Sequence, residues 1–261
     1  MAAVEREHRG AAAWLWLNRP EVRNALNSEI QELLGKNLKE LETQTTVRVI
    51  VLAGRGQAFS AGGDLTRMEQ AAKMTRARNR REAGRFARLL YEMHRYPKPI
   101  IARVHGAAFA GGMGLVAACD LVVAAEEAEF CLPEVRIGLV PAMISPYIAR
   151  ALGEPQTRRY MLTGERLPAP EAQRLGFVHE CVAVAELDAA VEKIVSQLVK
   201  AGPDALAQAK KLLARIAVAP LGPKLAAETA ALLAQVRAGP EAREGIRAFL
   251  EKRKQIGRAH V

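Results

Sequence analysis

The chain has 261 residues, 50% of them hydrophobic, and its 38 basic and 28 acidic side chains leave a formal net charge of +10. No run of about 18 apolar residues occurs, which excludes a membrane-spanning helix, and the early acids Glu5 and Glu7 do not fit a secretory leader, so we expect a cytoplasmic protein. The cysteines, Cys119, Cys131 and Cys181, are odd in number and lack ligand spacing, which argues against a disulfide framework and a zinc site.

Strand-like and helix-like stretches alternate through the first 200 residues. Short apolar and β-branched runs predict strands over 12–17, 47–53, 100–104, 121–125 and 177–182. Periodic apolar stripes predict helices over 29–44, with Ser28 as its N-cap, and over 75–96, 155–162, 170–175 and 186–200. Strands that alternate with helices indicate an α/β fold.

The strand pattern stops from Gly202 onward. Helices are predicted over 203–219, 223–237 and 240–254, each beginning with a proline, which suits the first turn of a helix. This tail is rich in alanine and leucine and has too little bulk for a strong core of its own. We therefore expect a core at residues 1–200 that holds the site. Residues 201–261 would be a helical appendage that packs on the core, on a neighbouring subunit, or on both.

Two glycine-rich turns carry the strongest functional pattern. They lie at 59–65 and 106–115, and each follows a strand-like run. Glycine lets backbone N–H groups approach a ligand closely, and a helix start leaves amides without partners. Two such turns brought together make an oxyanion hole, which stabilises charge that develops on a carbonyl oxygen. The pattern therefore points to chemistry on an acyl group.

Two other interpretations of these glycines need to be weighed. Gly112 to Ala117 fits the G-x-G-x-x-A pattern of dinucleotide sites, which prefers an acidic residue about 20 positions later at a strand end. Glu134 lies near that distance but follows Pro133, outside a recognisable strand, so this interpretation is weak. The structural alternative is a tight strand-to-helix turn with no ligand.

Glu134 is the chief titratable candidate. It lies in the largely apolar run 129–141, where desolvation would raise the pKa of a carboxyl and let it exchange protons near neutral pH. The alternatives are an ion pair with Arg136 or a first-turn acid after Pro133. His105 either lines the site or packs at a strand end, and the histidines show no paired ligand spacing.

Several segments together resemble the enoyl-CoA hydratase/isomerase (crotonase) superfamily. The resemblance is carried by 18–20 (Asn-Arg-Pro), 24–27 (Asn-Ala-Leu-Asn), 61–65 (Ala-Gly-Gly-Asp-Leu), the glycine cluster ending at Gly114, and the tail 243–254. It implies a crotonase fold, a spiral of strand-strand-helix repeats with a C-terminal helical trimerisation region. It also implies a homo-oligomer, a trimer or a hexamer built as a dimer of trimers.

The resemblance also implies roles for individual residues. The amides of Gly63 and Gly111 would hold the thioester oxygen, and Glu134 would be the general acid/base. The implied contacts to coenzyme A (CoA) are Val22, Arg23, Ala25, Leu26, Ala61, Asp64 and Leu65, with Phe249 and Lys252 reaching the CoA of a neighbouring subunit. No metal or separate cofactor is implied, since CoA is part of the substrate, and this polyanion would explain some of the positive charge.

The chain departs from the family pattern at two positions. Gly114 stands where typical hydratases carry a second glutamate, so its replacement by alanine is expected to cost little beyond local packing. Thr66 stands where many members have a phosphate-binding lysine, for which Arg67 would have to substitute. Three interpretations remain: a hydratase that uses Glu134 alone, a double-bond isomerase, and an acyl-CoA binder without efficient turnover.

We favour an enoyl-CoA hydratase of acyl-CoA catabolism. The run 135–147 resembles a bacterial branch assigned to methylglutaconyl-CoA or related branched substrates, whose distal carboxylate would suit the arginines between Arg76 and Arg88. Those arginines otherwise form a solvated helix face. A different class, RNA binding, fits the net charge, but no aromatic stacking platform accompanies it, so nucleic acid is not the expected partner.

Overall fold

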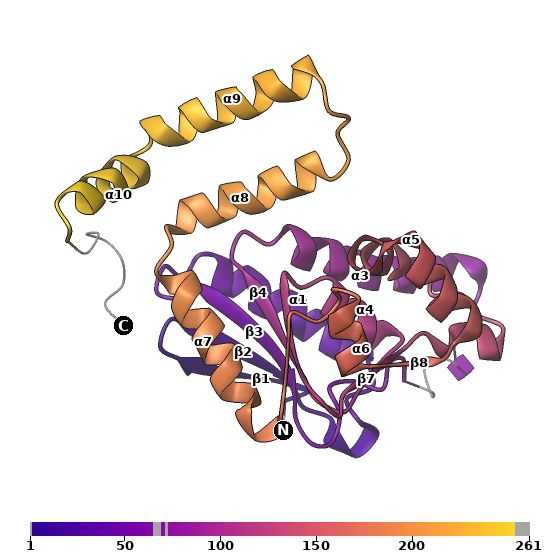
Figure 1. The fold of residues 1–261 in the computed structure, drawn as a ribbon. Helices are drawn as coiled ribbons and strands as arrows, with labels where there is room; N and C mark the ends of the chain where they lie inside the picture. The colour runs from indigo at the N-terminus through magenta and orange to yellow at the C-terminus, as the bar shows by residue number, and fades with distance from the viewer. Residues whose placement is uncertain (1, 65–68, 71–72, 254–261) are drawn as a thin grey trace.

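A computed structural model of the chain describes residues 2–64, 69–70 and 73–253. Its centre is a six-stranded sheet with the strand order β1-β2-β3-β4-β6-β9 (Figure 1). β1 pairs antiparallel with β2, and the other neighbours pair in parallel. The strands are β1 (Val4–Arg9), β2 (Ala12–Leu17), β3 (Val49–Gly54), β4 (Ile100–Val104), β6 (Leu121–Ala125) and β9 (Glu180–Val182).

A smaller sheet of three strands lies beside the end of the large one. It consists of β5 (Ala107–Phe109), β7 (Glu129–Cys131) and β8 (Arg166–Pro168) in the order β5-β7-β8. An isolated bridge between Ser60 and Ala108 joins the turn after β3 to β5. The two glycine-rich turns of the sequence are therefore neighbours in the fold.

The described helices include some that pack on each face of the large sheet. They are α1 (Ser28–Glu42), α3 (Arg76–Arg95), α4 (Gly111–Ala117), α5 (Ser145–Thr163), α6 (Ala169–Arg174), α7 (Leu187–Val199), α8 (Pro203–Ile216), α9 (Pro223–Ala238) and α10 (Pro240–Leu250), with short 3₁₀ turns η1 (Pro20–Val22), η2 (Pro133–Ile137) and η3 (Val184–Glu186). Leu15 and Leu17 point into the main core under α1, whereas Trp14 and Trp16 point to the opposite core, which Leu187 of α7 closes. This alternation follows from the two-residue period of a strand buried on both faces.

The α/β prediction is confirmed, and so are most of the predicted elements. β2, β4 and β6 have the predicted bounds, and α8, α9 and α10 begin at the predicted prolines. The prediction missed the edge strand β1, whose sequence VEREHR is charged, as is common at sheet edges, and it missed the short β5, β7 and β8.

One predicted helix start is wrong, and one helical piece was missed. The N-cap of α1 is Asn27, whose side-chain oxygen accepts a hydrogen bond from the Ile30 amide at 2.9 Å, so Ser28 is already helical. α5 consists of two helical pieces separated at Gly153, whose φ of 72° and ψ of 161° are not helical. The second piece begins beside Pro155, as predicted, whereas the first piece, which begins at Ser145, was not predicted.

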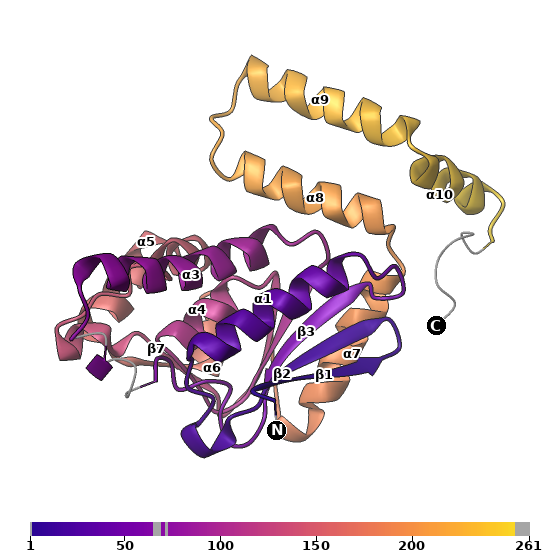
Figure 2. The same cartoon turned by 180° about the vertical axis from the view of Figure 1, so that it is seen from behind.

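The C-terminal helices form an arm that extends from the core (Figures 1 and 2). Lys210 of α8 holds the arm to the core through Asp120 at 2.6 Å. α9 and α10 lie beyond α8, and Leu221 in the connection between α8 and α9 is 95% exposed. Among the described residues, no helix combines the length and the apolar content needed to cross a membrane.

Candidate active site

Two loops that are distant in sequence run side by side next to the large sheet. The Ala61 amide donates to the Arg23 carbonyl at 2.8 Å, and the Leu26 amide donates to the Gly62 carbonyl at 2.7 Å. The Asp64 amide then donates to the Leu26 carbonyl at 3.2 Å. Because the neighbours of Gly63 make these bonds, its own N–H faces the opposite side of the chain.

The second glycine turn approaches the first at van der Waals distance. A Cβ on Gly62 would lie 2.8 Å from the Cβ of Ala110, and Gly62 has a φ of 95°, so only glycine fits there. Ala110 itself has a φ of 48° and a ψ of −120°, a backbone strain on the order of 1–3 kcal/mol for a residue with a side chain. This strained residue sets the direction of the next amide, that of Gly111 at the start of α4.

The amides of Gly63 and Gly111 share one property. Within the described part of the chain, neither N–H has a hydrogen-bond acceptor. A protein amide without a partner is uncommon unless it faces solvent or a ligand. Both groups are therefore available to a ligand oxygen.

Glu134 lies in η2, which follows directly from β7. The Ala110 amide donates to the carbonyl of Cys131 at 2.8 Å, and this bond ties the second glycine turn to the segment that carries Glu134. The carboxyl is buried, and its Oε2 atom has no hydrogen-bond partner among the described residues. Burial raises the pKa of Glu134, against a smaller opposing effect of a hydrogen bond from its own backbone.

The alternatives for Glu134 and His105 are decided by their contacts. Arg136 directs its guanidinium to the Thr163 carbonyl at 3.4 Å, and among the described residues it makes no ion pair with Glu134. Glu134 does lie in the first turn of η2 after Pro133, as the other alternative expected, and this position is compatible with its place in the cavity. His105 contacts the Gly56 carbonyl at 2.8 Å through Nε2, at the end of β4, as expected for a packed histidine.

A cavity of about 530 Å³ brings the predicted groups together. Gly63, Gly111 and Glu134 all line it, as do Leu26 and Asp64. An apolar wall is formed by Phe86 of α3 and by the segment 139–144. Two donors, one desolvated carboxyl and an apolar wall can hold a carbonyl oxygen and exchange a proton at a neighbouring carbon.

The structure shows why the two glycine positions of the G-x-G pattern have no room for a side chain. A Cβ on Gly112 would lie 2.7 Å from the Ser60 carbonyl, and one on Gly114 would collide with the Cγ2 methyl of Ile144, which is buried. Both glycines therefore allow close packing inside the fold, which argues against a dinucleotide at this turn. The cost in local packing that we expect for Gly114→Ala has its source here, because Ile144 already fills the space.

The predicted CoA contacts fall into two groups. The first group lies on the two paired loops. On one loop Val22 and Arg23 are exposed and Ala25 is buried, and on the other Ala61 and Asp64 are partly buried. The Arg19 guanidinium joins the two loops through the Ala25 carbonyl at 2.9 Å and the Asp64 carboxylate at 3.1 Å. Leu65, Thr66 and Arg67 lie outside the described residues.

The tail residues lie elsewhere in this chain. Phe249 of α10 is 82% exposed, and Lys252 is also exposed. Neither lines the cavity, and α10 lies on the other side of the molecule from α5 in both views (Figures 1 and 2). Within one chain, the two residues and the cavity are therefore separate.

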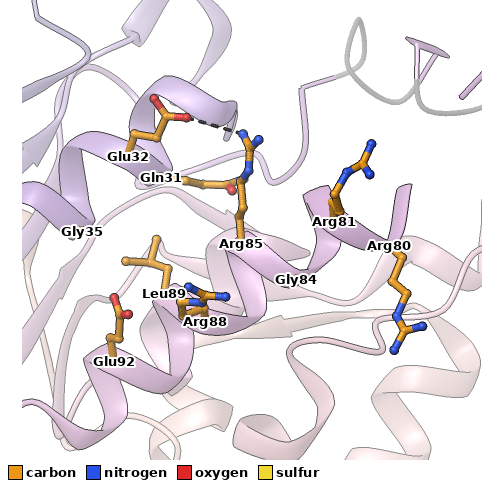
Figure 3. Close-up of a pocket in the computed structure, with 10 residues that line it drawn as sticks. All are labelled: Gln31, Glu32, Gly35, Arg80, Arg81, Gly84, Arg85, Arg88, Leu89 and Glu92. Carbon is orange, nitrogen blue, oxygen red and sulfur yellow. Dashed lines mark ion pairs between the residues drawn. The ribbon is translucent and has the colours of Figure 1, made fainter. Parts of the chain in front are cut away.

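A second hollow adjoins the cavity along α1 and α3 (Figure 3). It measures about 580 Å³ and is lined by exposed arginines of α3, among them Arg80, Arg81 and Arg88. We call it the arginine groove. Arg85 lines both hollows and lies 3.5 Å from Glu32 of α1. Of the predicted cluster, Arg85 is the arginine that lines the cavity with Glu134.

The sequence interpretation missed the α3 wall of the cavity. Asn79, Glu82, Ala83 and Phe86 line it, and their spacing of i, i+3, i+4 and i+7 places them on one helix face. The period was visible in the sequence, but the dense arginines around it favoured a solvated face. The face of α3 that lines the cavity became clear only from the structure, in which segment 139–144 lines the same cavity.

Comparisons with known proteins agree on one family. The family model for enoyl-CoA hydratase/isomerase matches residues 7–257. A Thermus thermophilus protein with a provisional enoyl-CoA hydratase name is 40% identical over 97% of this chain and 98% of its own length. The 2,3-dehydroadipyl-CoA hydratase of Escherichia coli is 35% identical over 92% of each chain. The crystal structure of an enoyl-CoA hydratase from Shewanella pealeana matches with a TM-score of 0.94 at 35% identity, covering 97% of this chain and 95% of that one.

Proposed function

This chain belongs to the enoyl-CoA hydratase/isomerase family and has its crotonase fold, and on that premise we propose that it adds water across the double bond of an α,β-unsaturated acyl-CoA thioester. One observation carries the proposal. The buried carboxyl of Glu134 lines the same cavity as the amides of Gly63 and Gly111. Among the described residues, its Oε2 atom has no hydrogen-bond partner and the two amides have no acceptor.

The chemistry follows from these groups. The two amides receive the thioester oxygen, and each well-aimed donor lowers the barrier by about 3–4 kcal/mol as that oxygen gains enolate charge. Glu134, kept protonated to higher pH by burial, gives its proton to the α-carbon. In the simplest form of the reaction the same carboxyl also receives the proton that the attacking water loses.

The CoA moiety is proposed to lie along the paired loops that contain Arg23 and Ala61. Their backbone groups, held together by Arg19, offer a rigid edge to the adenine, with Val22, Ala25, Leu26 and Asp64 along it. Binding energy from this remote part of the substrate can position the reacting thioester. The net charge of +10 favours such a polyanion.

The acyl group is proposed to be branched or to end in a carboxylate. Arg85 lines the cavity, and its guanidinium can meet a distal anion in competition with Glu32. The relative named 2,3-dehydroadipyl-CoA hydratase is consistent with a carboxylated substrate.

The arm at residues 201–261 is proposed to pack on a second copy, which would complete the site with Phe249 and Lys252. Glu241 of α10 accepts hydrogen bonds from the Asp204 and Ala205 amides at 3.0 and 2.9 Å and so caps α8. Deletion of 240–261 should therefore loosen α8, reduce the oligomer measured by light scattering and weaken CoA binding. An unchanged oligomer would contradict this assembly.

The function is tested with straight, branched and carboxylated enoyl-CoA esters, followed at the absorbance of the conjugated thioester. Loss of that absorbance with water addition confirmed by mass is expected. A 3-enoyl-CoA that gains the absorbance while no ester is hydrated would instead identify an isomerase. Tight, sequence-selective RNA binding at physiological salt, without turnover, would favour the RNA interpretation.

A further inference from the structure

Besides Glu134, two carboxyl groups line the cavity: that of Asp64, which pairs with Arg19 at 3.1 Å, and that of Glu82 on α3. Glu82 lines the cavity together with Glu134, Gly63 and Gly111. Its side chain is 25% exposed, in contrast to the buried Glu134. The carboxyls of Glu82 and Glu134 therefore differ in their access to water within one cavity.

The helix geometry brings Glu82 close to the reacting region. Phe86 lies one turn further along the same face, and its Cζ atom would be 3.4 Å from a Cβ on Gly111. Residues four apart on a helix have Cβ atoms about 5–6 Å from each other, so Glu82 stands one turn from the residue that touches the Gly111 turn. On the same helix, the Nε atom of Arg78 lies 4.0 Å from the Oε1 atom of Glu82.

Hydration needs two proton movements at different atoms. The attacking water loses a proton near the β-carbon, and the α-carbon gains one. Glu134 is desolvated, which suits a group that delivers a proton to carbon, whereas a partly hydrated carboxylate is suited to hold a water molecule.

Resting on the proposed hydratase function, we propose that Glu82 is a second catalytic residue, the base that takes the proton of the attacking water. The water oxygen forms the bond to the β-carbon while the Glu82 carboxylate accepts one water proton. The π pair of the double bond moves to make the enolate, whose oxygen is held by the Gly63 and Gly111 amides, and the protonated Glu134 then gives its proton to the α-carbon. One proton returned from Glu82 to Glu134 through solvent restores both groups.

The two steps can be separated experimentally. Exchange of the α-hydrogen of a saturated acyl-CoA with D₂O needs the two amides and Glu134, but no water addition. Hydration of crotonyl-CoA needs the two amides, Glu134 and also Glu82. Glu82→Gln should lower the hydration rate by about 10²-fold and leave the exchange rate and the dissociation constant for the CoA ester within twofold. Glu134→Gln should lower both rates.

The matched control is Glu92→Gln, the same change on the same helix at an exposed residue that lines the arginine groove instead of the cavity. It should change neither rate, and thermal unfolding should show that all variants are folded. Near-normal hydration by Glu82→Gln, or equal losses of hydration and exchange, would overturn the role of Glu82 and leave the hydratase function standing. Failure of the unmodified protein to hydrate any ester would overturn the hydratase function itself, and the role of Glu82 with it.

Discussion

The cavity and the arginine groove have similar volumes, about 530 and 580 Å³, and share Gln31 and Arg85, yet they differ in how their polar groups are satisfied. The groove presents exposed guanidinium groups, which water solvates (Figure 3). The cavity contains a carboxyl oxygen of Glu134 that is buried with no partner in the described part of the structure. Burying such a group costs free energy that packing alone does not explain, so it supports the cavity as the proposed active site.

Among the tests of this difference between the cavity and the groove, Glu134→Gln should have the largest effect. Because the amide cannot deliver the proton, turnover should fall by about 10²–10⁴-fold, while CoA-ester binding should stay nearly intact. Steady-state kinetics and calorimetric titration with a saturated CoA ester measure the two quantities. Glu129→Gln is the control, since that carboxylate pairs with Arg166 at 2.8 Å and does not line the cavity. Near-normal turnover by Glu134→Gln would refute its role.

A second test concerns the cavity wall. Gly114→Ala should destabilise the protein by about 1–3 kcal/mol, because the new methyl overlaps the buried Ile144 side chain. Chemical denaturation measures the loss. The double variant with Ile144→Ala should show a smaller penalty for adding the methyl at Gly114 than the single variant does. An undiminished penalty would show that the strain arises from contacts other than Ile144.

A smaller effect, on the KM of a carboxylated substrate, should show directly whether the cavity or the arginine groove receives the distal carboxylate. Arg85→Met should raise the KM for a carboxylated enoyl-CoA by roughly two- to fivefold, as expected for a partly exposed ion pair, and leave crotonyl-CoA unaffected. Arg81→Met, the same change at a residue of the groove alone, should alter neither. Equal effects of both changes would mean that the groove, instead of the cavity, attracts the substrate.

The smallest expected effect is the contribution of the Glu134 carboxyl to the pH dependence of protein stability. Burial raises the pKa of Glu134 in the folded chain above its unfolded value, so the folded state binds the proton more tightly. The stability linked to that proton is fully present below the unfolded pKa and is lost as pH rises through the folded pKa. Melting temperatures of the unmodified protein should therefore fall relative to Glu134→Gln between pH 4 and pH 8. A difference independent of pH would contradict the raised pKa.

Much of the fold was readable from local patterns. The two-residue period of β2 and the apolar stripe of α1 predicted those elements, and the prolines marked the starts of α8, α9 and α10. β1 could not be predicted in this way, because its charged side chains lie at a sheet edge where local preference is overridden by pairing with β2. The first piece of α5, before Gly153, was not predicted, whereas Pro155 correctly marked the start of the second piece.

The sequence by itself determined the chemistry of the parts: two turns that only small residues can form, and a glutamate among apolar neighbours. These follow from the steric limits of the backbone and from the cost of moving a carboxyl out of water, both of which act over a few residues. The tertiary structure alone decided which parts meet. The pairing of Ser60 with Ala108, the filling of the space at Gly114 by Ile144, and the turn of Glu82 toward the cavity all depend on contacts between distant segments. Such contacts are set by strand register and packing across the whole core, which no local pattern encodes.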